Sequence, residues 1–183
     1  MPLKKDYNLR PVEDKDLEIV LEWRNSEHIR ANMYSDHIIN ADEHQAWYNR
    51  IKQDRESSFN IFEYQQRPLG IVQFNNIDKK NNNSFWGFYL GEQNLPKGTG
   101  LVLGYFGLTF GFEKLELRKI IGESFVFNTV SVNFHKKLGF VEEGRYKKHI
   151  LKNGNYEDIV SFAIFIDNWV ENKVRLENLI KFN

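Results

Sequence analysis

A glycine-punctuated segment between residues 85 and 115 constrains the fold of this chain more than any other feature. A strand-like run at residues 85–90 leads into Leu95-Pro96-Lys97-Gly98-Thr99-Gly100, and an apolar helical run follows to residue 115. Four glycines share one face of that helix, at spacings of four, three and four: Gly100, Gly104, Gly107 and Gly111. Each glycine inside a helix costs about 1 kcal/mol relative to alanine. Close packing against a sheet or against an extended ligand would offset that cost, and we favour the sheet for the middle glycines.

The runs on either side of this segment predict the remaining elements. We expect strands at residues 7–12, 59–64, 69–74, 85–90, 119–124, 141–151 and 156–166, and helices at 17–23, 41–54, 101–115 and 128–138. The Asn153-Gly154 dipeptide between the last two strands is a strong hairpin signal. This order predicts a three-layer α/β domain, with a central mixed, mostly antiparallel, seven-stranded sheet flanked by about four helices.

Composition narrows the possible functions. A chain of 183 residues has the size of one domain, so we expect a single domain over residues 1–183. The net charge is zero, which does not favour nucleic-acid binding. The chain has no cysteine, which excludes a cysteine nucleophile and a thiolate metal site, and we expect no metal. We see no apolar run long enough to span a membrane, so we expect a cytoplasmic protein that does not bind membranes.

The loop at residues 95–100 has the features of an anion site. A glycine-rich loop that opens a helix presents free backbone N–H groups at the positive end of the helix dipole, where a phosphate or pyrophosphate can bind. Gly98 and Gly100 would let a ligand approach the backbone closely. The loop is not a Walker motif, because no Gly-Lys-Ser/Thr follows the first glycine. A plain turn that begins a helix is the alternative.

A second segment makes a family resemblance specific. Asn128-Thr129-Val130-Ser131-Val132-Asn133-Phe134-His135-Lys136-Lys137-Leu138-Gly139-Phe140 resembles the GNAT superfamily pattern of an asparagine after the fifth strand, a helix ending in an aromatic residue and a tyrosine, and then Gly-Phe. The loop at residues 95–100 resembles that superfamily's pyrophosphate motif, with Leu95 in place of the usual Gln or Arg. The resemblance covers nearly the whole chain. It implies the GNAT fold and an acetyl-CoA-dependent N-acetyltransferase.

The same resemblance implies where acetyl-CoA binds. The backbone of Lys97, Gly98, Thr99 and Gly100 would hold the pyrophosphate. The pantetheine arm would run beside Phe88, Tyr89 and Leu90, whose backbone amides could polarise the thioester carbonyl. Asn128 and Ser131 would hold the arm from the other side. Because the chain has no cysteine, the acceptor amine would attack the thioester directly.

Two residues are the candidates for proton transfer. His135 occupies the position of the superfamily's tyrosine, and its imidazolium, with an unperturbed pKa of about 6.5, is a competent acid near neutrality for the CoA thiolate. Its alternative is a surface or capping histidine. Glu123 lies in an apolar strand, where a charge is costly unless it is paired or useful. We expect it to act as the base, commonly through a water, and the alternative is an acid that reaches solvent where the strands splay apart.

The N-terminal third suggests the acceptor. Its Trp-Arg-Asn motif at residues 23–25 and the later residues Met33, Tyr34, His44 and Trp47 resemble the UDP-4-amino-4,6-dideoxy-N-acetyl-altrosamine N-acetyltransferases of pseudaminic acid biosynthesis. That resemblance implies a nucleotide-sugar site lined by Arg24, Met33, Tyr34, His44 and Trp47. Each has a packing alternative: Met33 could be core, Trp47 could simply pack its helix, and Arg24 could pair with Glu22 or Glu27.

Two other functions remain open at this point. One is a GNAT enzyme for another amine, such as a polyamine, an antibiotic or a ribosomal protein N-terminus. The other is a non-catalytic protein of the same fold that only binds CoA. A homodimer is compatible with every one of these functions.

Overall fold

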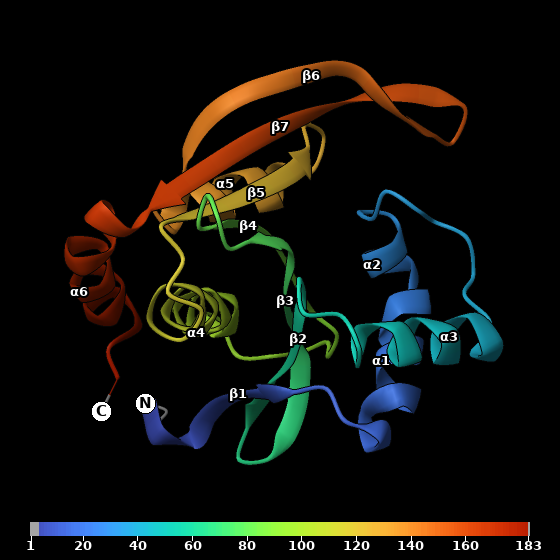
Figure 1. Cartoon of the computed structure of the whole chain (residues 1–183), viewed down its shortest axis with the longest axis horizontal. Helices are drawn as coiled ribbons and strands as arrows, with labels where there is room; N and C mark the ends of the chain where they lie inside the picture. Colours follow the sequence, from blue (N-terminus) through green and yellow to red (C-terminus); the bar gives the residue numbers. More distant parts are fainter. Residues whose placement is uncertain (1–3, 183) are drawn as a thin grey trace.

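The computed structural model describes residues 4–182, which form one seven-stranded mixed sheet and six α-helices (Figure 1). The strands are β1 (Tyr7–Pro11), β2 (Ser58–Tyr64), β3 (Arg67–Asp78), β4 (Asn83–Leu90), β5 (Lys119–Phe125), β6 (Val141–Lys152) and β7 (Asn155–Phe165). The helices are α1 (Leu17–Asn25), α2 (Glu27–Arg30), α3 (Ala41–Ile51), α4 (Thr99–Glu113), α5 (Thr129–Lys137) and α6 (Trp169–Ile180). The predicted α/β fold is confirmed. The single-turn helix α2 and the C-terminal helix α6 are additional to the four helices expected.

The sheet has the strand order β1-β2-β3-β4-β5-β7-β6. All neighbouring strands are antiparallel except β4 and β5, which are parallel. A parallel pair needs a crossover connection, and the glycine-rich loop and α4 provide it. The first half of the sheet is therefore a meander and the second half is built around a hairpin. The junction between the halves lies at the β4–β5 pair.

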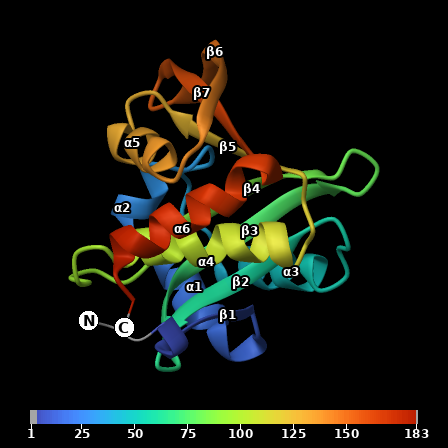
Figure 2. The same cartoon turned by 90° about the vertical axis from the view of Figure 1, so that its left-hand side faces the viewer.

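Side chains that alternate along the strands build a core on each face of the sheet. Phe62 and Val72 belong to the larger core, which α4, α5 and α6 cover. Their neighbours Ile61 and Ile71 point to the opposite face, into a smaller core with Val20, Trp23 and Ile29 from α1 and α2. In Figure 1 the two helical layers lie on opposite sides of the sheet, and in Figure 2 α4 and α6 lie side by side. No helix within residues 4–182 combines the length and the apolar character needed to cross a membrane.

The glycine face of α4 packs closely against its neighbours, as expected for the middle glycines. A Cβ added at Gly107 would lie 3.1 Å from the ring of Trp86, and one at Gly111 would lie 2.6 Å from the side chain of Ile120. A Cβ at Gly104 would meet Leu138, just beyond α5, at the same close range. Helix and sheet therefore approach more closely than side chains would allow.

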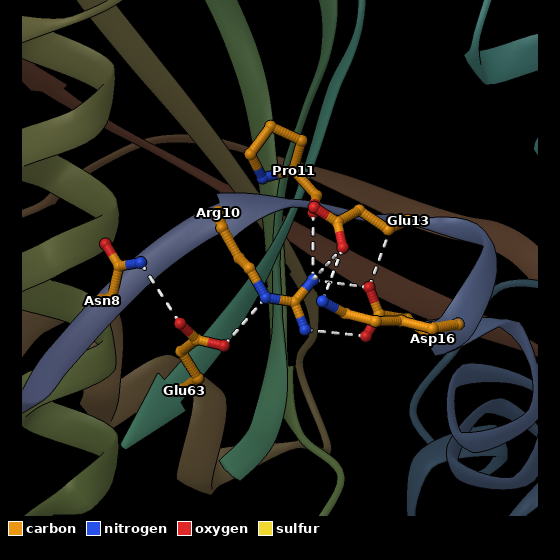
Figure 3. A network of polar contacts seen from close by, with 7 residues as sticks. Asn8, Arg10, Pro11, Glu13, Asp16 and Glu63 are labelled. Atoms are coloured by element: carbon orange, nitrogen blue, oxygen red, sulfur yellow. Dashed lines mark hydrogen bonds and ion pairs between the residues drawn. The ribbon is translucent and has the colours of Figure 1, made fainter. Parts of the chain in front are cut away.

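A network of charges fixes the start of the first helix. Arg10 on β1 bonds Asp16 through both terminal nitrogens, at 2.6 and 2.8 Å, and bonds Glu63 on β2 through Nε at 2.8 Å (Figure 3). Asp16 also accepts the backbone N–H of Glu13. Asp16 and Glu63 are almost fully buried, so their charges need these partners. The network ties the first two strands to the start of α1.

The β6–β7 hairpin extends from the sheet to a position above α2 (Figure 1). The predicted Asn-Gly turn is present, since Asn153 and Gly154 have φ values of 49° and 79°, which a type I′ turn requires. The pairing shifts register between Tyr146 and Ile150. Within that bulge, Lys148 donates its backbone N–H to Oδ1 of Asp158 at 2.7 Å. Bulges bend a strand, and this one lies where the hairpin leaves the sheet.

Candidate functional site

The two parallel strands diverge in the middle of the sheet. β4 and β5 pair from Asn83 opposite Lys119 to Trp86 opposite Gly122. Beyond that point β4 continues to Leu90 along β3, while β5 continues to Phe125 along β7. Within residues 4–182, the stretch of β4 from Gly87 to Leu90 therefore has a free edge. An extended ligand could bind this edge as an added strand does.

The glycine-rich loop lies at the far end of this free edge. Gly98 caps α4 with a φ of 97°, which favours glycine, and a Cβ there would meet no heavy atom within 4 Å. Gly100 is nearly as open, since a Cβ added there would lie 3.8 Å from Phe134 and 3.9 Å from Leu90. The Thr99 hydroxyl donates to the Pro96 carbonyl at 2.8 Å, which tightens the turn. An open helix N-terminus of this kind fits a pyrophosphate group.

The helix α5 follows β5, the strand that diverges from β4 at this opening. Asn128 caps that helix, because its Oδ1 accepts the backbone N–H of Ser131 at 3.0 Å. This bond uses one lone pair of the side-chain oxygen of Asn128 and leaves its amide N–H₂ group without a partner in the cap. The Ser131 hydroxyl lies 3.5 Å from Nδ1 of His135. Asn128 and Ser131 thus lie at the start of α5, directly after β5.

His135 is deeply buried, which makes it neither a surface nor a capping histidine. Its ring stacks on Phe162 with the centroids 5.1 Å apart, and the rings of Phe140, Phe88 and Trp86 surround it. The indole N–H of Trp86 donates to Nε2 of His135 at 3.3 Å. Because the indole can only donate, the ring proton sits on Nδ1, which donates to the Ser131 carbonyl at 2.9 Å.

This environment corrects the protonation state expected from the sequence. Burial lowers the pKa of His135 to about 4, despite the opposing effect of the Ser131 carbonyl. The imidazole is therefore neutral at pH 7, and the expected imidazolium acid is not present there. Both ring nitrogens are also engaged. The unperturbed pKa on which the expectation rested does not hold for a ring enclosed by aromatic side chains.

Glu123 lies on β5 one residue past the last β4–β5 pair. Its Oε2 accepts the hydroxyl of Tyr34 at 2.8 Å. Burial and the carboxylate of Glu123 raise the pKa of Tyr34, so the phenol keeps its proton at neutral pH. Two residues 89 positions apart, predicted for different roles, thus meet at the opening between the strands.

The other residues predicted to line the acceptor site divide into two groups by their position in the fold. Arg24 lies at the end of α1 and donates to the carbonyl and hydroxyl of Ser35 at 2.8 and 2.9 Å. Its Nη1 is buried and has no hydrogen-bond partner among residues 4–182. Among residues 4–182, Arg24 forms no ion pair with Glu22 or Glu27, which was the alternative considered from the sequence. Met33 packs on the smaller core and precedes Tyr34.

His44 and Trp47 form the second group, on α3. His44 is buried, and its Nε2 lies 2.9 Å from the Leu17 carbonyl at the start of α1. Trp47 stacks on His44 and meets Phe59 of β2 edge-to-face, with the ring centroids 5.3 Å apart. These contacts lie between α3, α1 and β2. They match the packing alternative rather than a position beside Glu123.

Lys152, which directly precedes the Asn153-Gly154 turn, also belongs to this region. Its side chain is buried, and Nζ donates to the Met33 carbonyl at 2.8 Å and the Arg30 carbonyl at 3.3 Å. The partners are 119 and 122 residues away in the sequence, so no local pattern indicates the contact.

Comparison with known proteins agrees with this architecture. The family model described as an acetyltransferase (GNAT) domain matches residues 9–160. The chain is 28% identical to the SPbeta prophage-derived uncharacterized N-acetyltransferase YokL of Bacillus subtilis, over 87% of this chain and 90% of that protein. It is 23% identical to the acetyltransferase PseH of Campylobacter jejuni, over 73% and 82%.

Among solved structures, the spermidine N-acetyltransferase of Vibrio cholerae in complex with CoA and spermine superposes with a TM-score of 0.85. The match covers 91% of this chain and 99% of that one, at 24% sequence identity. It establishes that the two chains share a fold.

Proposed function

The chain belongs to the GNAT acetyltransferase family and is an N-acetyltransferase, and we propose that it transfers the acetyl group of acetyl-CoA directly to the primary amine of a small anionic acceptor. The acceptor we propose is the 4-amino group of a UDP-4-amino-4,6-dideoxy sugar. The observation that carries the proposal is the pair of Tyr34 and Glu123 at the opening between β4 and β5. It places a carboxylate beside the edge that fits an extended ligand.

The residues around the opening suit acetyl-CoA, which would supply the acetyl thioester. The backbone of residues 97–100 would hold the pyrophosphate, since the start of α4 is open and Gly98 has no neighbour for a side chain to meet. The free edge of β4 at Phe88, Tyr89 and Leu90 would hold the pantetheine arm, and Asn128 and Ser131 would flank it from α5. Backbone amides along that edge would stabilise negative charge on the thioester oxygen.

Glu123 would act as the base. The acceptor attacks as the neutral amine, and its nitrogen gains positive charge as the N–C bond forms and the C–S bond breaks, so one proton must leave that nitrogen to give the neutral amide. The carboxylate of Glu123 would take that proton, directly or through water. The Tyr34 hydroxyl, bonded to Oε2, would leave Oε1 to face the amine.

His135 has a different role in this proposal from the one its sequence position implies. Its neutral ring has no free proton at Nε2, which accepts from Trp86. We propose that the departing thiolate takes its proton from solvent. His135 would hold Trp86 at the point where the two strands diverge.

Arg24 supports an anionic acceptor. Its buried Nη1 lacks an acceptor among the described residues, and a buried unpaired donor costs about 1–3 kcal/mol. A phosphate or carboxylate oxygen would satisfy it, and the planar guanidinium suits both. A polyamine has no such group. The diphosphate of a nucleotide sugar does, and the resemblance of the segment from Trp23 to Trp47 to the amino-sugar enzymes supports the same class.

A turnover panel tests the proposal. Acetyl-CoA consumption is measured against UDP-4-amino-4,6-dideoxy sugars, spermidine, an aminoglycoside and peptides with free N-termini, with Glu123→Gln as the catalytic control. We expect the nucleotide sugar to give the highest kcat/KM and Glu123→Gln to lower it by about 10²–10⁴-fold. Preference for spermidine would overturn the anionic acceptor. If the whole panel fails while acetyl-CoA still binds, the chain is a binding protein rather than an enzyme for these amines.

A further inference from the structure

Lys152 is a buried lysine with no role in the acetyl transfer described so far. It ends β6 at the tip of the hairpin, and only 4% of its side chain is exposed. A buried ammonium group is costly unless hydrogen bonds and charges compensate it. Its partners are the carbonyls of Arg30 and Met33, and the carboxylate of Asp36 at 3.5 Å. Lys152 therefore binds the chain where α2 ends and where carbonyls lack helical partners.

The contacts of Lys152 lead directly to the reactive carboxylate. Met33, which accepts the shorter hydrogen bond, precedes Tyr34, and the Tyr34 hydroxyl donates to Glu123. The ring of Phe125 is a second connection between Lys152 and Tyr34. It lies 5.5 Å from the ammonium of Lys152, and its centroid is 5.4 Å from that of Tyr34.

Phe125 and Glu123 are two residues apart on β5, so their side chains leave the strand on the same face. The ammonium, the two rings and the carboxylate form one contiguous cluster. This contiguity supplies a physical route from Lys152 to Glu123.

The hairpin explains how a residue so distant in the sequence arrives there. The bulge between Tyr146 and Ile150 is held by the bond from Lys148 to Asp158, and the tip beyond it lies above α2 (Figure 1). Bulges are used to direct a strand away from its sheet. This one directs Lys152 onto the segment of residues 30–36.

We propose that Lys152 is a positioning residue for acetyl transfer: it fixes residues 30–36 so that the Tyr34 hydroxyl orients the carboxylate of Glu123 toward the acceptor amine. The inference rests on the proposed function in one respect, the role of Glu123 as base. The contact between Lys152 and residues 30–36 does not depend on that role and can be tested without an acceptor.

The first test is hydrogen exchange on the free full-length protein. In Lys152→Met the carbonyls of Arg30 and Met33 lose their donor, and peptides spanning residues 30–36 should exchange about 10-fold faster or more, the usual worth of a bond to a charged group. Peptides from α3 should not change. Lys147→Met is the matched control, because Lys147 is an exposed lysine on the same strand. Unchanged exchange at residues 30–36 in Lys152→Met would overturn the inference.

The second test is a double-mutant cycle in turnover, with the acceptor that the panel identifies. Lys152→Met should lower kcat/KM for the acceptor by about 10-fold or more, with acetyl-CoA affinity by calorimetry unchanged within about 2-fold. In a Tyr34→Phe background, Lys152→Met should have little further effect, because the hydroxyl it positions is gone. If the two substitutions instead lower kcat/KM independently, so that their fold-changes multiply in the double variant, Lys152 does not act through Tyr34. Full turnover in Glu123→Gln would instead overturn the proposed function, whatever the exchange result.

Discussion

The indole nitrogen of Trp86 and Nε2 of His135 are joined by a hydrogen bond directly above the last residue pair that connects β4 to β5. Trp86 is itself a member of that pair, opposite Gly122. A Cβ on Gly122 would collide with Nε2 of His135 and lie 2.8 Å from Nε1 of Trp86. The point where the strands diverge is therefore set by three residues from β4, β5 and α5.

The buried imidazole should make stability depend on pH. Burial lowers the pKa of His135 from 6.5 to about 4 in the folded protein, so as pH falls the unfolded chain binds the proton first. The stability is fully present above pH 6.5 and is lost as pH falls toward 4. Relative to His135→Gln, the wild type should lose about 2 kcal/mol of unfolding free energy between pH 7 and pH 5. Urea unfolding of both proteins measures this, and parallel pH profiles would contradict it.

The absence of a side chain at residue 122 should contribute to the stability of the folded protein. Gly122→Ala should destabilise the protein by about 1–3 kcal/mol, the usual cost of overpacking, because neither ring can move without breaking the Trp86–His135 bond. Gly144→Ala is the control, since a Cβ there meets no heavy atom within 4 Å. Thermal melting compares the two variants, and the melting temperature of Gly122→Ala should be the lower one. Equal melting temperatures would show that the rings adapt freely.

In contrast to Gly122, Gly100 should tolerate an added side chain without loss of stability, but a branched side chain there should weaken acetyl-CoA binding. A Cβ there meets nothing closer than 3.8 Å, and alanine is the better helix former, so Gly100→Ala should gain up to about 1 kcal/mol of stability. Gly100→Val places a branched side chain at the same open helix start and should weaken acetyl-CoA binding while the protein stays folded. Calorimetry measures the affinity. Unchanged affinity in Gly100→Val would remove this loop from the acetyl-CoA site.

The charge network around Arg10 should contribute strongly to stability (Figure 3). Burial alone would raise the pKa of Asp16, but the bonds from Arg10 and the Glu13 amide lower it overall. Asp16→Asn leaves the guanidinium short of a counter-charge and should cost about 3 kcal/mol. Asp14→Asn is the matched control, since that carboxylate is exposed and 3.7 Å from Lys52, and it should cost under about 1 kcal/mol. Similar losses in both variants would assign the effect to the helix start rather than to the network.

Features encoded in short stretches of sequence were predictable. The glycine spacing in α4 and the Asn-Gly turn each depend on residues within one or a few turns of chain, and the structure has both. The strand count followed from such local signals too. The helix α2 was missed because a single turn leaves no periodic pattern.

Features that depend on residues distant in the sequence were not predictable. The protonation state of His135 is set by aromatic rings from β4 and β7, and no local signal carries that information. Lys152 reaches Met33 from the tip of a hairpin that has a bulge, and the two residues are 119 positions apart. The family resemblance grouped Trp47 with Arg24 in one acceptor site, whereas the orientation of α3 directs Trp47 against Phe59.

That difference between Arg24 and Trp47 gives the last prediction. Arg24→Ala should raise the Michaelis constant for the acceptor by about 10-fold or more and leave that for acetyl-CoA unchanged, because the buried Nη1 has no acceptor among the described residues and an anionic substrate group would supply one. Trp47→Ala should instead lower unfolding free energy by about 2–3 kcal/mol through lost packing on Phe59 and His44. In the folded fraction of Trp47→Ala, both Michaelis constants should match the wild type. A selective rise in the acceptor constant for Trp47→Ala would return this residue to the acceptor site. An unaltered acceptor constant in Arg24→Ala would remove the anionic group from the proposed substrate.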